Sequence, residues 1–293
     1  MNLLTSLFRA VRPGAFGGLA MLAMATVASA QERYGPNPPA SSYGHLHDEL
    51  FRLITILTGV SFLIVLVLLI VPILRDRARP GHKAHYDHGS SLHDKRFTAI
   101  VSITVFLVLD AWVLIIAMQD LREQQWNVPA AEMAPNAVRV QVLAQQWSWN
   151  LRQPGSDGEF GTADDILTMN ELTVPASAMP DVEGGDPVHQ GRPVVLNLSS
   201  KDVIHSFFVP DMRIKRDANP GAINRAWFMP IEAGDYQILC AELCGYAHYQ
   251  MHGMLHVLSE ADYDAWVEEA SRQALAAHDE NDEEARWAWE WQE

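Results

Sequence analysis

The chain has 293 residues, a formal net charge of −15 and 48% hydrophobic residues, so it is long and apolar enough to bury a sizeable core. From Gln119 onward, 29 acidic residues stand against 11 basic ones, which argues against a nucleic-acid partner. Only two cysteines occur, which excludes a disulfide-rich scaffold, and no Cys-x-x-Cys-His motif is present to attach a haem covalently.

The first 30 residues have the features of a signal peptide. Arg9 and Arg12 supply positive charge, residues 19–27 form a short apolar stretch, and Ala-Ser-Ala at 28–30 matches a cleavage site. A third membrane helix is the alternative, but this apolar stretch is short for crossing a bilayer. Residues 31–52 are then expected to be an N-terminal segment in the periplasm.

Two later stretches are long and apolar enough to be transmembrane helices. Residues 53–74 carry no charge and residues 97–118 carry only Asp110, so each can cross about 30 Å of hydrocarbon. The loop between them, residues 75–96, holds six Lys or Arg against three Asp, which places it in the cytoplasm. A carboxylate within a span is costly, so Asp110 is expected to meet a neighbouring subunit, a proton path or a structural hydrogen-bond partner.

Residues 119–258 change to short β-type segments separated by Gly, Pro and Asp, which predicts an all-β sandwich or barrel. The expected strands are residues 138–143, 194–198, 203–208, 225–229, 236–239 and 254–257. The Gly- and Asp-rich residues 155–165 are expected to form a solvated hairpin rather than a calcium site. Ser259 with Asp262 forms a capping signature, so residues 259–293 are expected to be a helix followed by an acidic tail.

The segment Cys240-Ala-Glu-Leu-Cys244-Gly-Tyr-Ala-His248-Tyr-Gln-Met251 places both cysteines, a histidine and a methionine within twelve residues. Thiolate, imidazole and thioether are ligands that copper favours. His205, which follows a short β-type run, is the expected donor from elsewhere in the chain. A disulfide or a zinc site are the alternatives, but a disulfide leaves the His and Met unexplained and zinc rarely binds methionine.

These motifs, together with Asp202-Val-Ile-His-Ser-Phe-Phe-Val-Pro and Lys215-x-Asp-x-x-Pro-Gly, closely resemble those of subunit II of cytochrome c oxidase. The resemblance implies a cupredoxin-like domain behind a two-helix transmembrane hairpin, with a binuclear CuA centre in which two copper ions share both thiolates. The ligands that it implies are Cys240, Cys244, His205, His248, Met251 and the main-chain carbonyl of Glu242. The carboxylate of the same glutamate would bind a magnesium ion shared with subunit I.

The stretch Gln145-Gln-Trp147-Ser-Trp149 has a simple interpretation as two core aromatics, because residues i and i+2 lie on one face of a strand. The resemblance implies more, since the family has Gln-Trp-x-Trp at this point and receives electrons from cytochrome c at the first tryptophan. Trp147 is therefore expected to accept electrons, with Trp149 closer to the metal. An acidic exported domain also suits a basic donor protein.

The resemblance further implies a subunit of the bacterial inner membrane whose copper domain lies in the periplasm. It would take electrons from a soluble or membrane-anchored cytochrome c and pass them to haem in subunit I, where oxygen is reduced to water and protons are pumped. Subunit III and membrane lipid are the other expected neighbours. Two alternatives are the CuA relay subunit of a nitric-oxide reductase and a membrane-tethered copper-delivery protein, although a delivery protein would not need Gln-Trp-x-Trp.

Overall fold

The computed structural model describes residues 37–77, 80–81, 83, 88–122, 126–177 and 191–279. The predicted signal peptide, residues 31–36 of the segment that follows it, and the tail from residue 280 lie outside the described residues. The chain divides into two compact units, Met1–Pro38 and Pro39–Glu293, and the second contains nearly all of the described residues.

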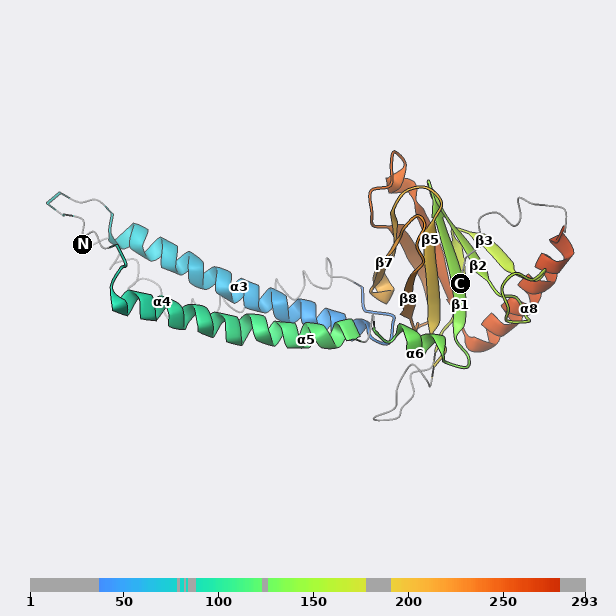
Figure 1. Cartoon of the computed structure of the whole chain (residues 1–293), viewed down its shortest axis with the longest axis horizontal. Helices are drawn as coiled ribbons and strands as arrows, with labels where there is room; N and C mark the ends of the chain where they lie inside the picture. Colours follow the sequence, from blue (N-terminus) through green and yellow to red (C-terminus); the bar gives the residue numbers. More distant parts are fainter. Residues whose placement is uncertain are drawn as a thin grey trace, which may run out of the picture. The chain divides into compact units, whose positions relative to one another are not determined.

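Two long helical segments precede the strands and run side by side (Figure 1). Their parts are α3 (Gly44–Arg75), α4 (Leu92–Val105), the π-helical turn η1 (Phe106–Asp110) and α5 (Ala111–Leu121). Each segment is long and apolar enough to cross a membrane, judged by length and composition. Ser91 begins α4, where its hydroxyl accepts a hydrogen bond from the Asp94 amide at 3.1 Å. Asp110 ends the π-helical turn, with its side chain on the exposed helix surface.

The described strands form two five-stranded sheets, ordered β3-β2-β1-β5-β8 and β4-β10-β9-β6-β7. The strands of the first sheet are β1 (Val138–Gln145), β2 (Ser148–Gln153), β3 (Ile166–Met169), β5 (Val194–Ser200) and β8 (Asn224–Phe228). Those of the second are β4 (Glu171–Pro175), β6 (His205–Val209), β7 (Ile214–Ala218), β9 (Gly234–Cys240) and β10 (His252–Leu258). The β1–β5 and β4–β10 pairs are parallel, and the other pairs are antiparallel. The predicted all-β architecture is confirmed.

Side chains from both sheets fill one core, in which Trp149, Phe207 and Leu255 are fully buried. Short helices border this core: α6 (Val128–Glu132), η3 (Pro210–Met212), η4 (His248–Gln250) and α8 (Glu260–Ala277). Helix α8 begins at the predicted cap, where the Ser259 hydroxyl accepts from the Asp262 amide at 3.2 Å. We refer below to residues 126–279 as the β domain.

Six strands match the predicted ones within about two residues at either end, and four were not predicted. Strand β7 carries Lys215, Arg216 and Asp217 because it lies at a sheet edge, where charged side chains prevent further pairing. Strand β6 begins at His205, two residues later than expected, because the chain bends just before it.

The prediction of a solvated hairpin over residues 155–165 is wrong at its end. Asp164 and Asp165 are buried, because donors within the insert bind both carboxylates and Arg152 of β2 also binds Asp165. The Arg152 Nε donates to Asp165 at 2.8 Å, and the Gly161 amide donates to the same oxygen at 2.8 Å. The insert is therefore fastened to β2, and its acidic residues are partly structural.

A short segment before α3 is bound along the β domain. The Ala40 amide donates to the Asp211 carbonyl at 2.8 Å, and the Ser41 hydroxyl donates to the Met212 carbonyl at 2.7 Å. Tyr43 is buried, stands edge-on to Trp227 with ring centroids 5.3 Å apart, and donates its hydroxyl to the Trp227 carbonyl at 2.9 Å. These bonds join the start of the first long helix to the core.

We expect Tyr43→Phe to lower the free energy of unfolding by about 1 kcal/mol, because it deletes one buried hydrogen bond and keeps the ring contact. For a domain of this size the expected fall in Tm is about 2–4 °C, measured by thermal denaturation of the full chain. The matched control is Tyr246→Phe, which changes a side chain that is 90% exposed and should leave the Tm unchanged. Equal Tm values for both variants would contradict a stabilising role for the Tyr43 hydroxyl.

Candidate metal centre

The pairing of β6 with β9 brings the two halves of the candidate centre together. Phe207 lies opposite Cys240 in this antiparallel pair, so the start of β6 meets the end of β9. His205 is the first residue of β6 and is fully buried, while Cys240 is the last residue of β9 and is half-buried. Beyond Cys240 the chain turns back through η4 and returns along β10, so residues 240–251 form a closed loop around the cysteines.

The predicted soft donors converge within this loop. The Sγ atoms of Cys240 and Cys244 lie 3.8 Å apart, which is far longer than the ~2.05 Å of a disulfide, so both cysteines are free thiols. The His248 Nδ1 lies 3.4 Å from the Cys244 Sγ. The Met251 Sδ lies 3.1 Å from the His205 Nδ1 and 3.8 Å from the Cys244 Sγ.

The Glu242 carbonyl completes the set, because its oxygen lies 3.3 Å from the Cys240 Sγ. The ligand atoms of His205, Cys240 and Cys244 all lie within 4.8 Å of one another, a spacing that can hold a metal ion. All six residues of the predicted set are therefore close together, and their roles as ligands stay a prediction. Thiol, imidazole and thioether donors in one partly buried loop fit copper better than magnesium or calcium.

The two thiols differ in acidity. Burial alone would raise the pKa of Cys240, but hydrogen bonds from His205 and from the backbone outweigh it and lower that pKa below its usual range. Burial raises the pKa of Cys244, and the negative charge on Cys240 raises it further. The protein without metal therefore favours a single thiolate, so a metal that binds both sulfurs must displace the Cys244 proton.

Asp202 holds His205 from the side away from the sulfurs, a role that sequence reasoning missed. Its Oδ1 lies 2.9 Å from the His205 Nε2, so the Nδ1 atom faces the loop. Burial would raise the pKa of Asp202, but hydrogen bonds from His205 and from the amides of Gln146 and Val203 lower it overall. Such a carboxylate behind a ligand imidazole fixes the ring orientation.

Trp147 lies against the same loop. A Cβ added to Gly245 would sit 3.4 Å from the Trp147 ring and 2.7 Å from the Gln146 Nε2, and the φ of Gly245 is +121°, so only glycine suits this position. The Gln146 side chain donates to the Cys244 carbonyl at 2.7 Å. Trp147 is 38% exposed and thus has one side toward solvent and the other toward the cysteine loop.

Trp149, two residues later, points into the core. It is fully buried, with its ring centroid 6.1 Å from that of His205 and 5.2 Å from that of Phe207. The interpretation as a core aromatic therefore holds for Trp149 and not for Trp147. On the outer side of the cysteine loop, Leu243, Tyr246 and Tyr249 are strongly exposed to solvent.

Comparisons with known proteins agree with this geometry. The family model described as cytochrome c oxidase subunit II, periplasmic domain, matches residues 138–258. An alternative cytochrome c oxidase subunit 2 from Bradyrhizobium diazoefficiens is 33% identical over 242 residues, which cover 79% of this chain and 82% of that relative. This chain belongs to the cytochrome c oxidase subunit II family. A probable subunit 2 from Rickettsia bellii is 29% identical over 84% of this chain and 87% of the relative.

Membership of the subunit II family implies copper and identifies the β domain as cupredoxin-like. The solved periplasmic domain of subunit II of cytochrome oxidase from Bradyrhizobium japonicum is 24% identical, with a TM-score of 0.38, and covers 48% of this chain and 99% of that one. The matched range 138–258 extends from the first residue of β1 to the last residue of β10. It therefore includes every predicted copper donor.

We expect Asp202→Asn to weaken copper binding by about 10–100-fold, because His205 loses the carboxylate that orients its ring. Copper affinity of the purified full chain, measured by competition with a chelator, tests this expectation. The matched control is Asp235→Asn, since Asp235 also contacts a histidine, His256 Nδ1, at 2.7 Å but at the end of the β9–β10 pair opposite to the cysteine loop. Similar losses in both variants would contradict a specific role for Asp202.

Proposed function

We propose that this subunit II family member carries a binuclear CuA centre and is the electron-accepting subunit of a haem-copper cytochrome c oxidase. It would take electrons from cytochrome c and deliver them to haem in subunit I, where oxygen is reduced to water and protons are pumped. The observation that carries the proposal is the convergence of two thiols, one imidazole, a thioether and a carbonyl of the 240–251 loop with the His205 imidazole of β6.

Two metal ions suit this donor set better than one. The two Sγ atoms are 3.8 Å apart, with His248 beside Cys244 and the buried His205 beside Met251. Cys240 and Cys244 would hold two copper ions together with His205 and His248, and Met251 and the Glu242 carbonyl would be the weaker donors. A copper pair held there would take up and release single electrons with little change in its bonds.

The protein's part is to hold these donors in place. The Cys240 amide donates to the Met251 carbonyl at 3.2 Å, and the His248 amide donates to the Gly245 carbonyl at 3.2 Å. Burial of Met251 and Cys244 keeps water from competing for the metal. The Asp202 carboxylate fixes the His205 ring, so few groups would need to move when the charge of the centre changes.

Exposed groups on the same loop are suited to partner contacts. Glu242 is exposed beside Cys240, so its carboxylate is accessible to a magnesium ion shared with subunit I. The apolar side chains of Leu243, Tyr246 and Tyr249 are 75–90% exposed, which favours burial by a neighbouring subunit. Trp147 provides an indole between the surface and the loop, where electrons from cytochrome c would arrive.

The two long helices would anchor the subunit in the bacterial inner membrane, with the β domain in the periplasm. Asp110 supports packing against another subunit, because an exposed carboxylate in a span needs a polar partner. Subunit I would supply that partner, and subunit III and lipid would cover other faces. The CuA subunit of a nitric-oxide reductase would share these features, so the haem protein that copurifies with the chain decides between them.

A binuclear centre predicts two copper ions per chain and an electron paramagnetic resonance signal in which one unpaired electron couples equally to both nuclei. Cys244→Ser should abolish this signal, because it removes a sulfur that both metals share. Met251→Ala should keep the coupled signal and shift the reduction potential, because only a weak donor is lost. A single-copper spectrum in the unaltered protein, or an intact coupled signal in Cys244→Ser, would overturn the binuclear proposal.

We expect Trp147→Ala to slow electron transfer from reduced cytochrome c by at least about tenfold, which corresponds to about 1.4 kcal/mol of activation free energy. The copper signal should persist, because Trp147 lies beside the loop and offers no ligand. The matched control is Trp126→Ala, an exposed tryptophan close in sequence to the second helical segment, which should leave the rate unchanged. An unchanged rate in Trp147→Ala, measured by stopped flow, would show that electrons arrive elsewhere.

A further inference from the structure

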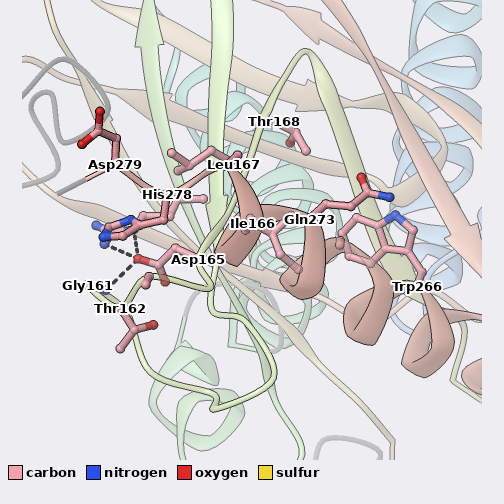
Figure 2. Close-up of a pocket in the computed structure, with 15 residues that line it drawn as sticks. Gly161, Thr162, Asp165, Ile166, Leu167, Thr168, Trp266, Gln273, His278 and Asp279 are labelled. Carbon is pink, nitrogen blue, oxygen red and sulfur yellow. Dashed lines mark hydrogen bonds and ion pairs between the residues drawn. The ribbon is translucent and has the colours of Figure 1, made fainter. Parts of the chain in front are cut away.

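A groove of about 720 Å³ lies between α8 and β3, at the edge of the first sheet (Figure 2). Its lining is mostly apolar or small and includes Ile166, Leu167, Trp266, Ala270, Ala274 and Ala277. In Figure 2, Trp266 lies at one end of the groove and His278 and Asp279 lie at the other. The alanines leave room along one side of α8, so the groove can take large apolar side chains.

The groove follows the open edge of β3. Among the described residues β3 is an outermost strand and pairs only with β2. The consecutive residues Ile166, Leu167 and Thr168 all line the groove although successive side chains of a strand point to opposite faces. The groove must therefore run beside the strand edge, where backbone donors and acceptors are available to an added strand.

The chain that follows α8 has a matching pattern. Residues 280–293 begin directly after Asp279, which itself lines the groove, and they include Trp287, Trp289 and Trp291. Tryptophans at every second position share one face of a β-strand, with Ala288 and Glu290 on the other face. We propose that residues 287–291 bind in the α8–β3 groove as an added strand, with their indoles against α8.

The lengths agree with this arrangement. Five residues in a strand span about 13 Å, and the length of α8 from Trp266 to Ala277 is about 16 Å. Residues 280–286 provide seven residues for the reversal of direction, which exceeds the usual length of a tight connection. The acidic residues of the connection stay in solvent, and Glu290 also faces away from the groove because it alternates with the tryptophans.

Photo-crosslinking from residue 289 tests this placement in the full chain, purified in detergent together with any bound subunits. A benzophenone amino acid in place of Trp289 should crosslink within the same chain, to residues 166–168 or to the 270–277 part of α8. Crosslinks only to another subunit or to a second copy of the chain would overturn the proposal, and so would the absence of any crosslink.

A second experiment keeps the crosslinker at residue 289 and alters the groove. Ala274→Trp fills the groove and should reduce the intrachain crosslink by at least about tenfold, as expected when a docked segment is displaced. Ala276→Trp is the matched control, because Ala276 is exposed on α8 and does not line the groove, so the crosslink should persist. Equal yields in the two variants would overturn the proposal.

Hydrogen–deuterium exchange gives an independent readout on unmodified backbone. Replacing the three tail tryptophans by serine should speed exchange of the β3 amides by about tenfold or more, because the added strand protects them. The control, Ala288→Ser with Glu290→Gln, alters the opposite face and should leave β3 protected. Unchanged exchange in the tryptophan variant would show that the edge of β3 is not covered by the tail.

Discussion

The antiparallel contact between β6 and β9 is the constraint on which the candidate centre depends. It places Phe207 opposite Cys240, and the Ala241 amide continues the ladder by donating to the Ser206 carbonyl at 2.9 Å. His205 thereby reaches the cysteines from a segment 35 residues earlier in the chain. A shift of this register by one residue would turn His205 to the opposite face and separate the imidazole from both sulfurs.

Backbone bonds to the rest of the domain then make the loop rigid. The Cys240 amide binds the Met251 carbonyl and closes the loop at its ends, and the Gln146 side chain binds the Cys244 carbonyl and fixes the loop to the turn between β1 and β2. The backbone of Gln146 in turn donates to Asp202 at 2.7 Å, and Asp202 holds His205. One connected network thus orients donors from two separate segments, which favours a metal centre that changes charge without changing shape.

Much of this arrangement could be predicted from the sequence, because the informative residues are close together in the chain. The spacing of Cys240, Cys244, His248 and Met251 predicts a tight loop of soft donors. Apolar alternation also predicts the buried strands, since burial on one face produces that pattern. Apolar alternation does not reveal charged strands such as β7, because β7 lies at a sheet edge and its charged side chains do not follow a burial pattern.

The contacts that support the candidate ligands could not be predicted from the sequence, because a single aspartate or glutamine forms no recognisable sequence pattern. Asp202 looks in the sequence like any aspartate in a turn. Its role becomes clear only from the bend in the chain that directs its carboxylate toward His205. Asp165 was expected in solvent, because Gly and Asp favour exposed turns, and the structure instead pairs it with Arg152. In both cases one specific partner side chain, His205 for Asp202 and Arg152 for Asp165, determines the environment.

Strand β6 also determines where the candidate metal centre lies relative to the first helix, α3. Strand β6 begins at His205 and spans about 13 Å between its end residues, after which η3 leads to Arg213. Arg213 is half-buried, adopts a left-handed conformation with φ of 54°, and donates from Nε and Nη2 to Asp48 in α3 at 2.7 and 2.9 Å. Because a paired strand is stiff, the beginning of α3 and the candidate metal donor are held at a set separation. The proposed electron relay would need this property, since the rate of electron transfer depends on the distance to the next acceptor.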